Sequence, residues 1–511
     1  MQNNDKKVLL RISNLKQYFP LKGGRFVKAN DGITLDIYEG ETFGLVGESG
    51  CGKSTLGRTI LQLYHQTYGR TMYYGRSLDD LAPKYVIDTV RNLKSRRTKL
   101  RELEQKRDKL EADYAKLSEK EQYAKHGELD TARKLAEDAL LDITKIVGGF
   151  LVVDDLDPVI AAYSKDYAIA RKLSSMEEKR QELQVDVDDA EYAKKTAEEA
   201  GKSGKDGQLQ KAQEKLKQCD DQIAALRAQL DAGRKEIEAL RAPYANDPEF
   251  QKYEAYRDDG IDLARLEYNE MRRLRRDMQL IFQDPYSSLN PRMSVGQIIS
   301  EGMQAHNMIK KKDARMQEMV LKIMDDCGLA PYFLHRFPHQ FSGGQRQRIG
   351  IARALATKPK FVVCDEAVSA LDVSIQAQII NLLLDLKEQQ NLTYMFITHD
   401  LSVVKYISDR VGVMYLGTMV ELAAADEIFH HPIHPYTEAL LNAIPTTDTV
   451  GAKELSILEG DIPSPVNPPK GCKFHTRCKY CTEICTQVVP EWEEVRPNHF
   501  VACHHKLEGK E

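Results

Sequence analysis

A glycine-rich stretch near the amino terminus of this 511-residue chain carries residues that can bind phosphate. The segment Gly47-Glu-Ser-Gly-Cys-Gly-Lys53-Ser54 fits the pattern GxxxxGK[ST], follows the apolar run FGLV and precedes the helix-forming run STLGRTILQLY. In this context backbone N–H groups surround phosphate oxygens, the lysine reaches the β- and γ-phosphates, and the serine hydroxyl is a ligand of Mg²⁺. The pattern therefore predicts a site for Mg²⁺ and a nucleoside triphosphate. We expect it to be lined by Gly47, Ser49, Gly50, Cys51, Gly52, Lys53, Ser54 and Thr55, with Cys51 contributing only its backbone.

A pair of acidic residues far along the chain can complete this chemistry. In the segment FVVCDEA, four apolar residues lead to Asp365 and Glu366. One carboxylate at a strand end can hold Mg²⁺ through water, and the next can polarise an attacking water molecule. An ordinary strand that ends in acidic residues has the same appearance, and the phosphate-binding pattern is what favours the catalytic interpretation. We expect Asp365 to bind the cofactor and Glu366 to be catalytic.

The elements that must position these residues are short buried strands and helices. ETFGLVG, FVVCDEA and YMFITHD have the continuous apolar runs of buried strands, and SIQAQIINLLLDLKEQQ is a helix. The stretches 1–82 and 261–445 have this α/β character. Between them, 83–260 is rich in Lys, Glu, Gln, Ala and Leu.

A third motif connects the phosphate site to a known family. Phe341-Ser-Gly-Gly-Gln345 precedes the helix RQRIGIARALATKP, and here the sequence resembles the ABC transporter ATPase family, whose signature is LSGGQ. The residue at the first signature position packs and does not bind nucleotide, so Phe341 is compatible with the role. The resemblance implies that the remaining signature residues contact the γ-phosphate of ATP bound by a second subunit. These residues are Ser342, Gly343, Gly344 and Gln345.

Further family motifs follow in the expected order. Gln283 in IFQDP is similar to the Q-loop residue that faces Mg²⁺ and the membrane partner, and Ser369-Ala-Leu-Asp372 resembles the D-loop. The resemblance implies that His399 in FITHD contacts the γ-phosphate and that Phe19 stacks on adenine, with Tyr18 as a close competitor. The predicted catalytic residues are therefore Glu366, His399 and Gln283, with Ser54 and Gln283 at the Mg²⁺ ion.

The branch of the family is indicated by three segments: QDPYSSLNPRM, HPYT and LEGDIPSPVNPPKGCKFHTRC. They resemble the oligopeptide/dipeptide importer ATPases, the F-type subunit in particular; nickel and glutathione importers share much of this pattern. The resemblance implies an ATPase that pairs with a different ATPase subunit as a heterodimer and drives two transmembrane permeases. An extracytoplasmic substrate-binding protein would deliver the peptide, and the chain would lie at the cytoplasmic face of the plasma membrane.

The carboxy-terminal stretch 446–511 contains a cluster of cysteines. In a reducing compartment such crowding favours metal ligation over disulfides, and four thiolates suit an iron–sulfur cluster or tetrahedral Zn²⁺. The resemblance implies a [4Fe–4S] cluster, whereas the spacing alone is compatible with a cluster, with Zn²⁺ or with free thiols. Cys481 departs from the family pattern, and His475, His504 and His505 are alternative ligands. The expected ligands are Cys472, Cys478, Cys485 and Cys503.

The stretch 83–260 interrupts the resemblance and has a heptad pattern. Its apolar residues recur every seven positions, which predicts a left-handed coiled coil. A weaker heptad lies upstream, at Leu103, Leu110 and Leu117, and the less charged stretch KIVGGFLVVDDLDPVIAAY separates the two. We therefore expect one antiparallel hairpin with a small head at that stretch. The two seams of the stronger heptad are Leu209, Leu216, Ile223, Leu230 and Ile237, and Ala212, Cys219, Leu226, Gly233 and Leu240.

Together these features predict an α/β P-loop NTPase of the ABC ATPase fold, split by an α-helical antiparallel coiled coil and followed by a small Cys-rich domain. The expected domains are 1–82, 83–260, 261–445 and 446–511.

The overall composition weakens the alternatives. With 73 Lys and Arg against 77 Asp and Glu, the net charge of −4 argues against a protein that binds nucleic acid by bulk charge. Chromosome-maintenance ATPases also combine an ABC head with a coiled coil, but they lack the HPYT segment and the Cys-rich tail. No apolar run approaches the roughly 20 residues that span a bilayer, and MQNNDKKVLL lacks the apolar core of a signal peptide.

Overall fold

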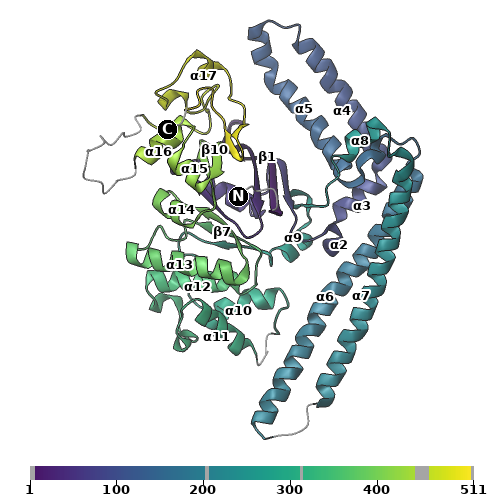
Figure 1. Ribbon diagram of the computed structural model, residues 1–511, viewed down its shortest axis with the longest axis vertical. Coiled ribbons are helices and arrows are strands. Elements are labelled where there is room, and N and C mark those ends of the chain that lie inside the picture. Colours follow the sequence, from purple (N-terminus) through teal and green to yellow (C-terminus); the bar gives the residue numbers. More distant parts are fainter. Residues whose placement is uncertain (1–5, 202–205, 311–314, 444–459, 508–511) are drawn as a thin grey trace. The chain divides into compact units, whose positions relative to one another are not determined.

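The computed structural model describes residues 6–201, 206–310, 315–443 and 460–507, without the side chains of 119–121, 123, 124 and 126 (Figure 1). The predicted boundary at 445 and the first part of the predicted carboxy-terminal domain, 446–459, lie outside the described residues. The chain divides into two compact units: residues 1–75 with 271–511, and residues 76–270.

The first unit is built on an eight-stranded sheet with the order β11-β12-β10-β9-β3-β8-β7-β6. Five of these strands run parallel, from β9 to β6, and the others are antiparallel. Every residue of β3, β7 and β8 is buried, which explains their continuous apolar runs. The strands are β3 (Thr42–Val46), β6 (Met278–Ile281), β7 (Phe361–Asp365), β8 (Thr393–Ile397), β9 (Arg410–Tyr415), β10 (Thr418–Ala424), β11 (Glu493–Arg496) and β12 (His499–Val501).

A second group of strands in this unit is antiparallel. β1 pairs with β2 on one side and with β4 on the other. The bounds are β1 (Val8–Pro20), β2 (Phe26–Tyr38) and β4 (Tyr68–Tyr73).

The helices of the first unit cover the sheet and enclose its main core. Buried residues of β6, β7 and β8 pack with five helices (α10 to α14) in one apolar cluster. A second cluster joins β9 and β10 to α15, α16 and Phe474 of the Cys-rich tail. The helices are α1 (Lys53–Ile60), α10 (Val295–Ala305), α11 (Met316–Asp326), α12 (Gly343–Leu355), α13 (Val373–Gln390), α14 (Leu401–Ile407), α15 (Ala425–His430), α16 (Pro435–Asn442) and α17 (Glu483–Gln487).

The second unit is almost entirely helical and contains two long hairpins, α4 with α5 and α6 with α7 (Figure 1). Along α7, the heptad residues Cys219, Ile223, Leu230 and Ile237 are buried, and residues of α6 pack against the first three. Ion pairs flank this seam, such as Lys165 with Glu236 at 2.7 Å. The helices are α2 (Leu78–Leu81), α3 (Lys84–Arg91), α4 (Leu93–Tyr114), α5 (Glu119–Val147), α6 (Asp157–Glu199), α7 (Asp206–Arg241) and α8 (Pro248–Glu254), with α9 (Tyr268–Leu274) at the boundary.

The prediction of a single hairpin with a head at KIVGGFLVVDDLDPVIAAY is wrong. The stretch after Leu117 is itself a long helix, α5, which folds back along α4 and ends where the head was expected. The expected head forms the 3-10 helix Gly148–Val152, whose Phe150 is completely buried in a core with α3, α5, α6 and α8. The sequence does contain a signal for the missed turn, because Ser118-Glu-Lys-Glu121 fits the capping-box pattern that starts a helix.

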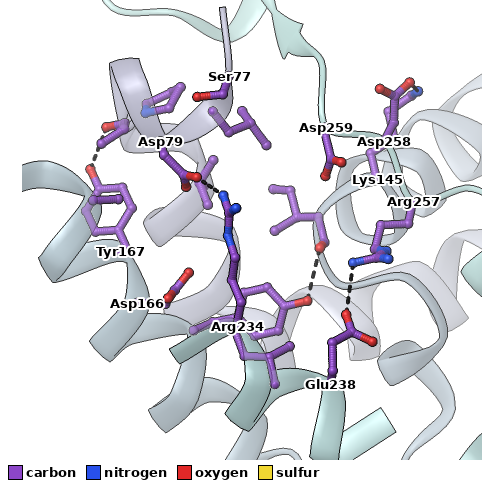
Figure 2. A pocket seen from close by; sticks show the side chains of 18 residues that line it. Ser77, Asp79, Lys145, Asp166, Tyr167, Arg234, Glu238, Arg257, Asp258 and Asp259 are labelled. Atoms are coloured by element: carbon purple, nitrogen blue, oxygen red, sulfur yellow. Dashed lines mark hydrogen bonds and ion pairs between the residues drawn. The ribbon is translucent and has the colours of Figure 1, made fainter. Parts of the chain in front are cut away.

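A cavity of about 500 Å³ lies within the second unit, between α2, the end of α5, α6 and α7 (Figure 2). Its polar side chains are mostly paired: Arg234 bonds to Asp79, and Arg257 lies 3.4 Å from Glu238. The carboxylate of Asp166 also lines the cavity. Within the described residues, Oδ1 of Asp166 is buried and has no hydrogen-bond partner.

Across the described ranges of the chain, no helix is both long enough and apolar enough to cross a membrane.

Candidate nucleotide-binding site

The glycine-rich loop connects β3 to α1, and its backbone requires glycine at two positions. Gly47 has a φ of 151°, and a Cβ there would lie 2.2 Å from the carbonyl oxygen of Met414. Gly52, at the start of α1, has a φ of 102°, and its Cβ would lie 2.1 Å from the carbonyl oxygen of Ala29. The loop therefore holds the amino terminus of α1 close to two other strands. The first N–H groups of a helix have no partner within the helix, and its amino terminus carries a partial positive charge, so this end of α1 favours the binding of an anion.

Lys53 lies inside this loop. Its side chain is buried, and Nζ donates hydrogen bonds to the carbonyl oxygens of Gly47 at 2.7 Å and Glu48 at 3.0 Å. The ammonium group is thus held by its own loop, where it can exchange carbonyl partners for phosphate oxygens.

Ser54 and Asp365 meet although 311 positions separate them. The serine hydroxyl donates to Oδ1 of Asp365 at 2.5 Å, and Arg58 of α1 donates to Oδ2 at 3.1 Å. Asp365 ends β7 and is fully buried. A hydroxyl and a carboxylate at this spacing are hard oxygen ligands, so the pair fits a Mg²⁺ ion bound with a nucleotide.

Glu366 is held in an uncommon backbone conformation at the end of β7. Its φ is 48°, and its N–H donates to the carbonyl oxygen of Ile397 at 2.9 Å. For a non-glycine residue this conformation costs on the order of 1 kcal/mol, and such strain is found mostly at functional sites. The side-chain amide of Gln283 donates to Oε2 of Glu366 at 2.5 Å, and Nδ1 of His399 lies 3.4 Å from Oε1.

The parallel strands explain why these residues meet. Gln283 follows β6, Glu366 follows β7, His399 follows β8, and the phosphate loop follows β3. Adjacent parallel strands place their carboxyl ends at one edge of a sheet, which is where ligands bind in such folds. The structure thus brings together the predicted phosphate, Mg²⁺ and catalytic residues.

The signature residues lie elsewhere, at the start of α12. Ser342 is exposed and caps the helix, exchanging hydrogen bonds with Gln345. A Cβ on Gly344 would lie 2.5 Å from Cγ2 of Ile375, so the helix approaches α13 closely. Phe341 is buried with its ring 4.9 Å from that of Phe333, which is the packing role expected for the first signature position.

The two aromatic candidates for adenine stacking have different surroundings. The hydroxyl of Tyr18 donates to Asp31 at 2.5 Å, and its ring lies near Tyr68 and Lys28. Phe19 is partly exposed and meets Tyr64 edge to face at 5.3 Å. The hydroxyl of Tyr18 is thus bonded within the protein, whereas the ring of Phe19 packs against one aromatic neighbour and stays partly exposed.

Residues of the HPYT segment and of the Cys-rich tail contact the phosphate loop, and the sequence analysis did not identify them. The N–H of Glu48 donates to the hydroxyl of Tyr436 at 2.9 Å, and Arg477 donates to both carboxylate oxygens of Glu48 at 2.7 and 3.0 Å. No local pattern signals these contacts, because the partners are distant in sequence and the loop motif leaves position 48 unspecified.

The cysteines of the tail are free thiols. Burial raises the pKa of Cys472 to about 11 and that of Cys503 to about 12, and the other thiols of the predicted set add to the increase. In the part of the chain that the structure describes, no three His, Cys, Asp or Glu side chains have the arrangement of a metal site. The alternative ligands bond elsewhere: His475 to Cys472 O, His504 to Val488 O, and His505 to Thr482.

Comparisons with known proteins relate the chain to two families. The family described as ABC transporter matches residues 30–251 and 253–369, and the family described as oligopeptide/dipeptide transporter, C-terminal region, matches residues 420–485. The oligopeptide transport ATP-binding protein AppF of Bacillus subtilis is 52% identical over 250 residues, covering 48% of this chain and 75% of AppF. The putative oligopeptide transport ATP-binding protein YkfD of the same species is 34% identical over 498 residues, covering 97% of this chain and 95% of YkfD.

Among solved structures, CbiO1 from Clostridium perfringens, part of the ABC transporter complex CbiONQ, matches with a TM-score of 0.40 at 16% identity, covering 83% of this chain and 92% of CbiO1. On the two family matches and the near full-length relative, the chain belongs to the ABC transporter family, among the ATP-binding proteins of oligopeptide/dipeptide transporters.

Proposed function

We propose that this chain binds and hydrolyses ATP to power the import of di- and oligopeptides through partner permeases. The observation that carries the proposal is the set of contacts at the carboxyl ends of β6, β7 and β8, where Ser54 bonds to Asp365 while Glu366 contacts both Gln283 and His399. The similarity to AppF and YkfD, which are named as oligopeptide transport ATP-binding proteins, supports the cargo class.

In the proposed mechanism the loop from Gly47 to Thr55 binds the phosphates, with Lys53 moving from its loop carbonyls to the β- and γ-phosphates. Ser54 and Gln283 would bind Mg²⁺ directly, and Asp365 would do so through water; when bound, the ion neutralises phosphate charge. Glu366 accepts a proton from the attacking water, and His399 orients Glu366 and the γ-phosphate. Phe19 stacks on the adenine.

Replacing Glu366 by Gln tests this assignment, because the amide keeps the shape but cannot accept the proton. We expect ATP binding to remain and steady-state hydrolysis to fall by about 10²- to 10⁴-fold. Glu388→Gln, an exposed residue on α13, is the matched control and should hydrolyse ATP normally. Undiminished hydrolysis by the Glu366 variant would refute the role.

The exposed signature supports a two-subunit ATP site. Ser342, Gly343, Gly344 and Gln345 bond within their own helix end, so we propose that they complete the ATP site of a second, related ATPase subunit. The heterodimer and the F-type identity of this chain belong to the same proposal. Cross-linking between a cysteine placed at Ser342 and one in the partner's phosphate loop, enhanced by ATP, would test it.

The surface beside Gln283 supports permease docking. Phe282, Tyr286 and Tyr332 expose large parts of their rings, at 38%, 67% and 67%. Arginines lie over these rings, such as Arg346 over Tyr286 at 5.0 Å. We propose that a short permease helix binds here at the cytoplasmic face of the plasma membrane, and that an extracytoplasmic binding protein supplies the peptide. ATPase activity should respond to permeases and not to DNA.

For the domains, we propose that 1–82 and 261–445 form the ATPase core, that 83–260 is an insertion and that 446–511 is a Cys-rich tail domain. The buried heptad positions of α7, with ion pairs on either side, support coiled-coil packing of α6 on α7. We propose that this insertion docks a partner. A chain lacking 83–260 should still bind ATP.

For the tail, we propose a [4Fe–4S] cluster on Cys472, Cys478, Cys485 and Cys503, with Zn²⁺ as the alternative. Four soft sulfur donors suit either metal. Metal binding would displace the thiol protons of Cys472 and Cys503, whose pKa values burial raises. Absorbance near 400 nm and iron analysis of anaerobically purified protein distinguish the cases. Cys478→Ser should reduce the iron content, whereas Cys481→Ser should not.

A further inference from the structure

The phosphate loop is anchored from the carboxy-terminal part of the chain. Arg477 forms a two-pronged ion pair with Glu48, and its side chain is only 4% exposed. Tyr436 binds the backbone N–H of the same residue at 2.9 Å. Glu48 thus has both its N–H and its carboxylate bonded to distant residues, which lie 388 and 429 positions away in the chain.

The segment that carries Arg477 is itself firmly packed. Phe474 is buried, with its ring 5.2 Å from those of Tyr415 and Tyr436 and 5.9 Å from that of His434. The ring of Tyr415 also lies 6.0 Å from the Arg477 guanidinium. A well-packed support of this kind limits the positions that the arginine, and through it the loop, can adopt.

The same segment also reaches β2, the strand that pairs with β1, on which the adenine candidate Phe19 lies. Nζ of Lys473 lies 3.2 Å from Oδ2 of Asp31 and 3.2 Å from the carbonyl oxygen of Leu416. Asp31 in turn accepts the hydroxyl of Tyr18, the neighbour of Phe19 on β1. Two basic residues of one short segment therefore contact the phosphate loop, through Glu48, and the β2 residue that binds Tyr18, through Asp31.

We propose that Lys473 and Arg477 are positioning residues for ATP, which set the phosphate loop and the base-stacking strand before the nucleotide binds. This inference rests on the proposed ATP binding. It adds that the tail segment with Lys473 and Arg477 helps to set the affinity for ATP. Pre-organisation lowers the cost of binding without taking part in chemistry. Loss of the anchor should therefore raise the Kd and the KM for ATP and leave kcat nearly unchanged.

Glu48 makes the inference testable, because two explanations predict opposite changes in ATP affinity for the same variant. If Glu48 acts only through its charge, Glu48→Gln removes a negative group near the phosphates and tightens ATP binding. If it acts as the receptor for Arg477, the same change releases the loop and weakens binding. A merely structural pair would lower the melting temperature without a coupled effect on nucleotide affinity.

The experiment is a double-mutant cycle on the full chain, with Kd for Mg²⁺ and a fluorescent ATP analogue as the readout. We expect Glu48→Gln and Arg477→Met each to raise Kd about tenfold, and the double variant to be no weaker than either single variant. Lys479→Met is the matched control, because Lys479 pairs at the surface with Glu438 and is 60% exposed. Arg477→Lys, which keeps the charge but loses the two-pronged geometry, should lie between wild type and Arg477→Met and serves if the methionine variant does not fold.

Binding by Glu48→Gln that equals or exceeds that of the wild type would overturn the inference, as would effects of the two single variants that simply add. The proposed function is tested separately in the same assay, because it requires that wild type and Glu366→Gln both bind the analogue. If neither binds, ATP binding itself is wrong; if both bind and the cycle shows no coupling, only the positioning role is wrong.

Discussion

Asp166 on α6 is partly buried, and its Oδ1 atom is buried without a hydrogen-bond donor among the described residues. This oxygen lies against α7, where a Cβ on Gly233 would be 2.5 Å away (Figure 2). Burial raises the pKa of Asp166 from its ordinary value of 3.8 to about 6, and Lys165 opposes the increase. We therefore expect Asp166→Asn to stabilise the protein at neutral pH.

The sign and size follow from proton linkage. Because the folded pKa is raised, the folded state holds its proton more tightly than the unfolded state. The stability that this proton contributes is complete below pH 3.8 and is lost as pH rises through about 6. Above pH 6 the wild type bears the cost of a poorly solvated charge, at most about 3 kcal/mol from the pKa difference. The side chain is only partly buried, so solvent screening reduces the figure, and we expect about 1–2 kcal/mol.

The assay is the free energy of unfolding from urea titrations followed by circular dichroism, at several pH values between 4.5 and 8. The advantage of Asp166→Asn over wild type should be largest at pH 8 and should shrink toward pH 4.5. Asp221→Asn, an exposed residue on α7, should show no such pH-dependent difference. An Asp166 variant that is less stable than wild type at pH 8, or a difference independent of pH, would refute the reasoning.

Two further predictions concern packing. Gly344→Ala should reduce ATP hydrolysis at least tenfold in the assembled transporter, because its Cβ would lie 2.5 Å from Ile375 and shift the signature helix; Gly350→Ala, with no atom within 4 Å, should retain activity. Ile223→Ala should lower the unfolding free energy of the helical unit by about 2–4 kcal/mol, because the side chain is 5% exposed in the seam with α6. The neighbouring exposed Gln222→Ala is its control, and urea titration measures both; equal losses in the two variants would contradict the packing argument.

Several features of the fold follow from local sequence alone. The glycine pattern before Lys53 and the apolar runs before Asp365 and His399 predict a loop and two strands without knowledge of any partner. The helix-forming runs and heptads likewise predict long helices between residues 83 and 260. Such patterns allow helices and strands to be predicted, because backbone geometry and side-chain periodicity are set within a few residues.

The arrangement of the helical unit could not be read in the same way. The heptads of α4 and α7 form apolar stripes, but a heptad pattern does not identify the helix that packs against it. The pairing of α4 with α5 and of α6 with α7 depends on where the chain turns. It also depends on the packing of Phe150 against α8. The thiols of the tail are a similar case, since their spacing suits a metal and the fold leaves them without the arrangement of one among the described residues.

By itself, then, the sequence determined which residues could bind phosphate and Mg²⁺, and which stretches would be strand or helix, because these depend on residue type and short-range spacing. Only the tertiary structure decided that Glu48 would be held by Tyr436 and Arg477, and that Tyr18 would bond to Asp31 and leave Phe19 available. Those contacts join residues far apart in the chain, and the free energy that selects them comes from burial and pairing in the completed core, which no local window contains.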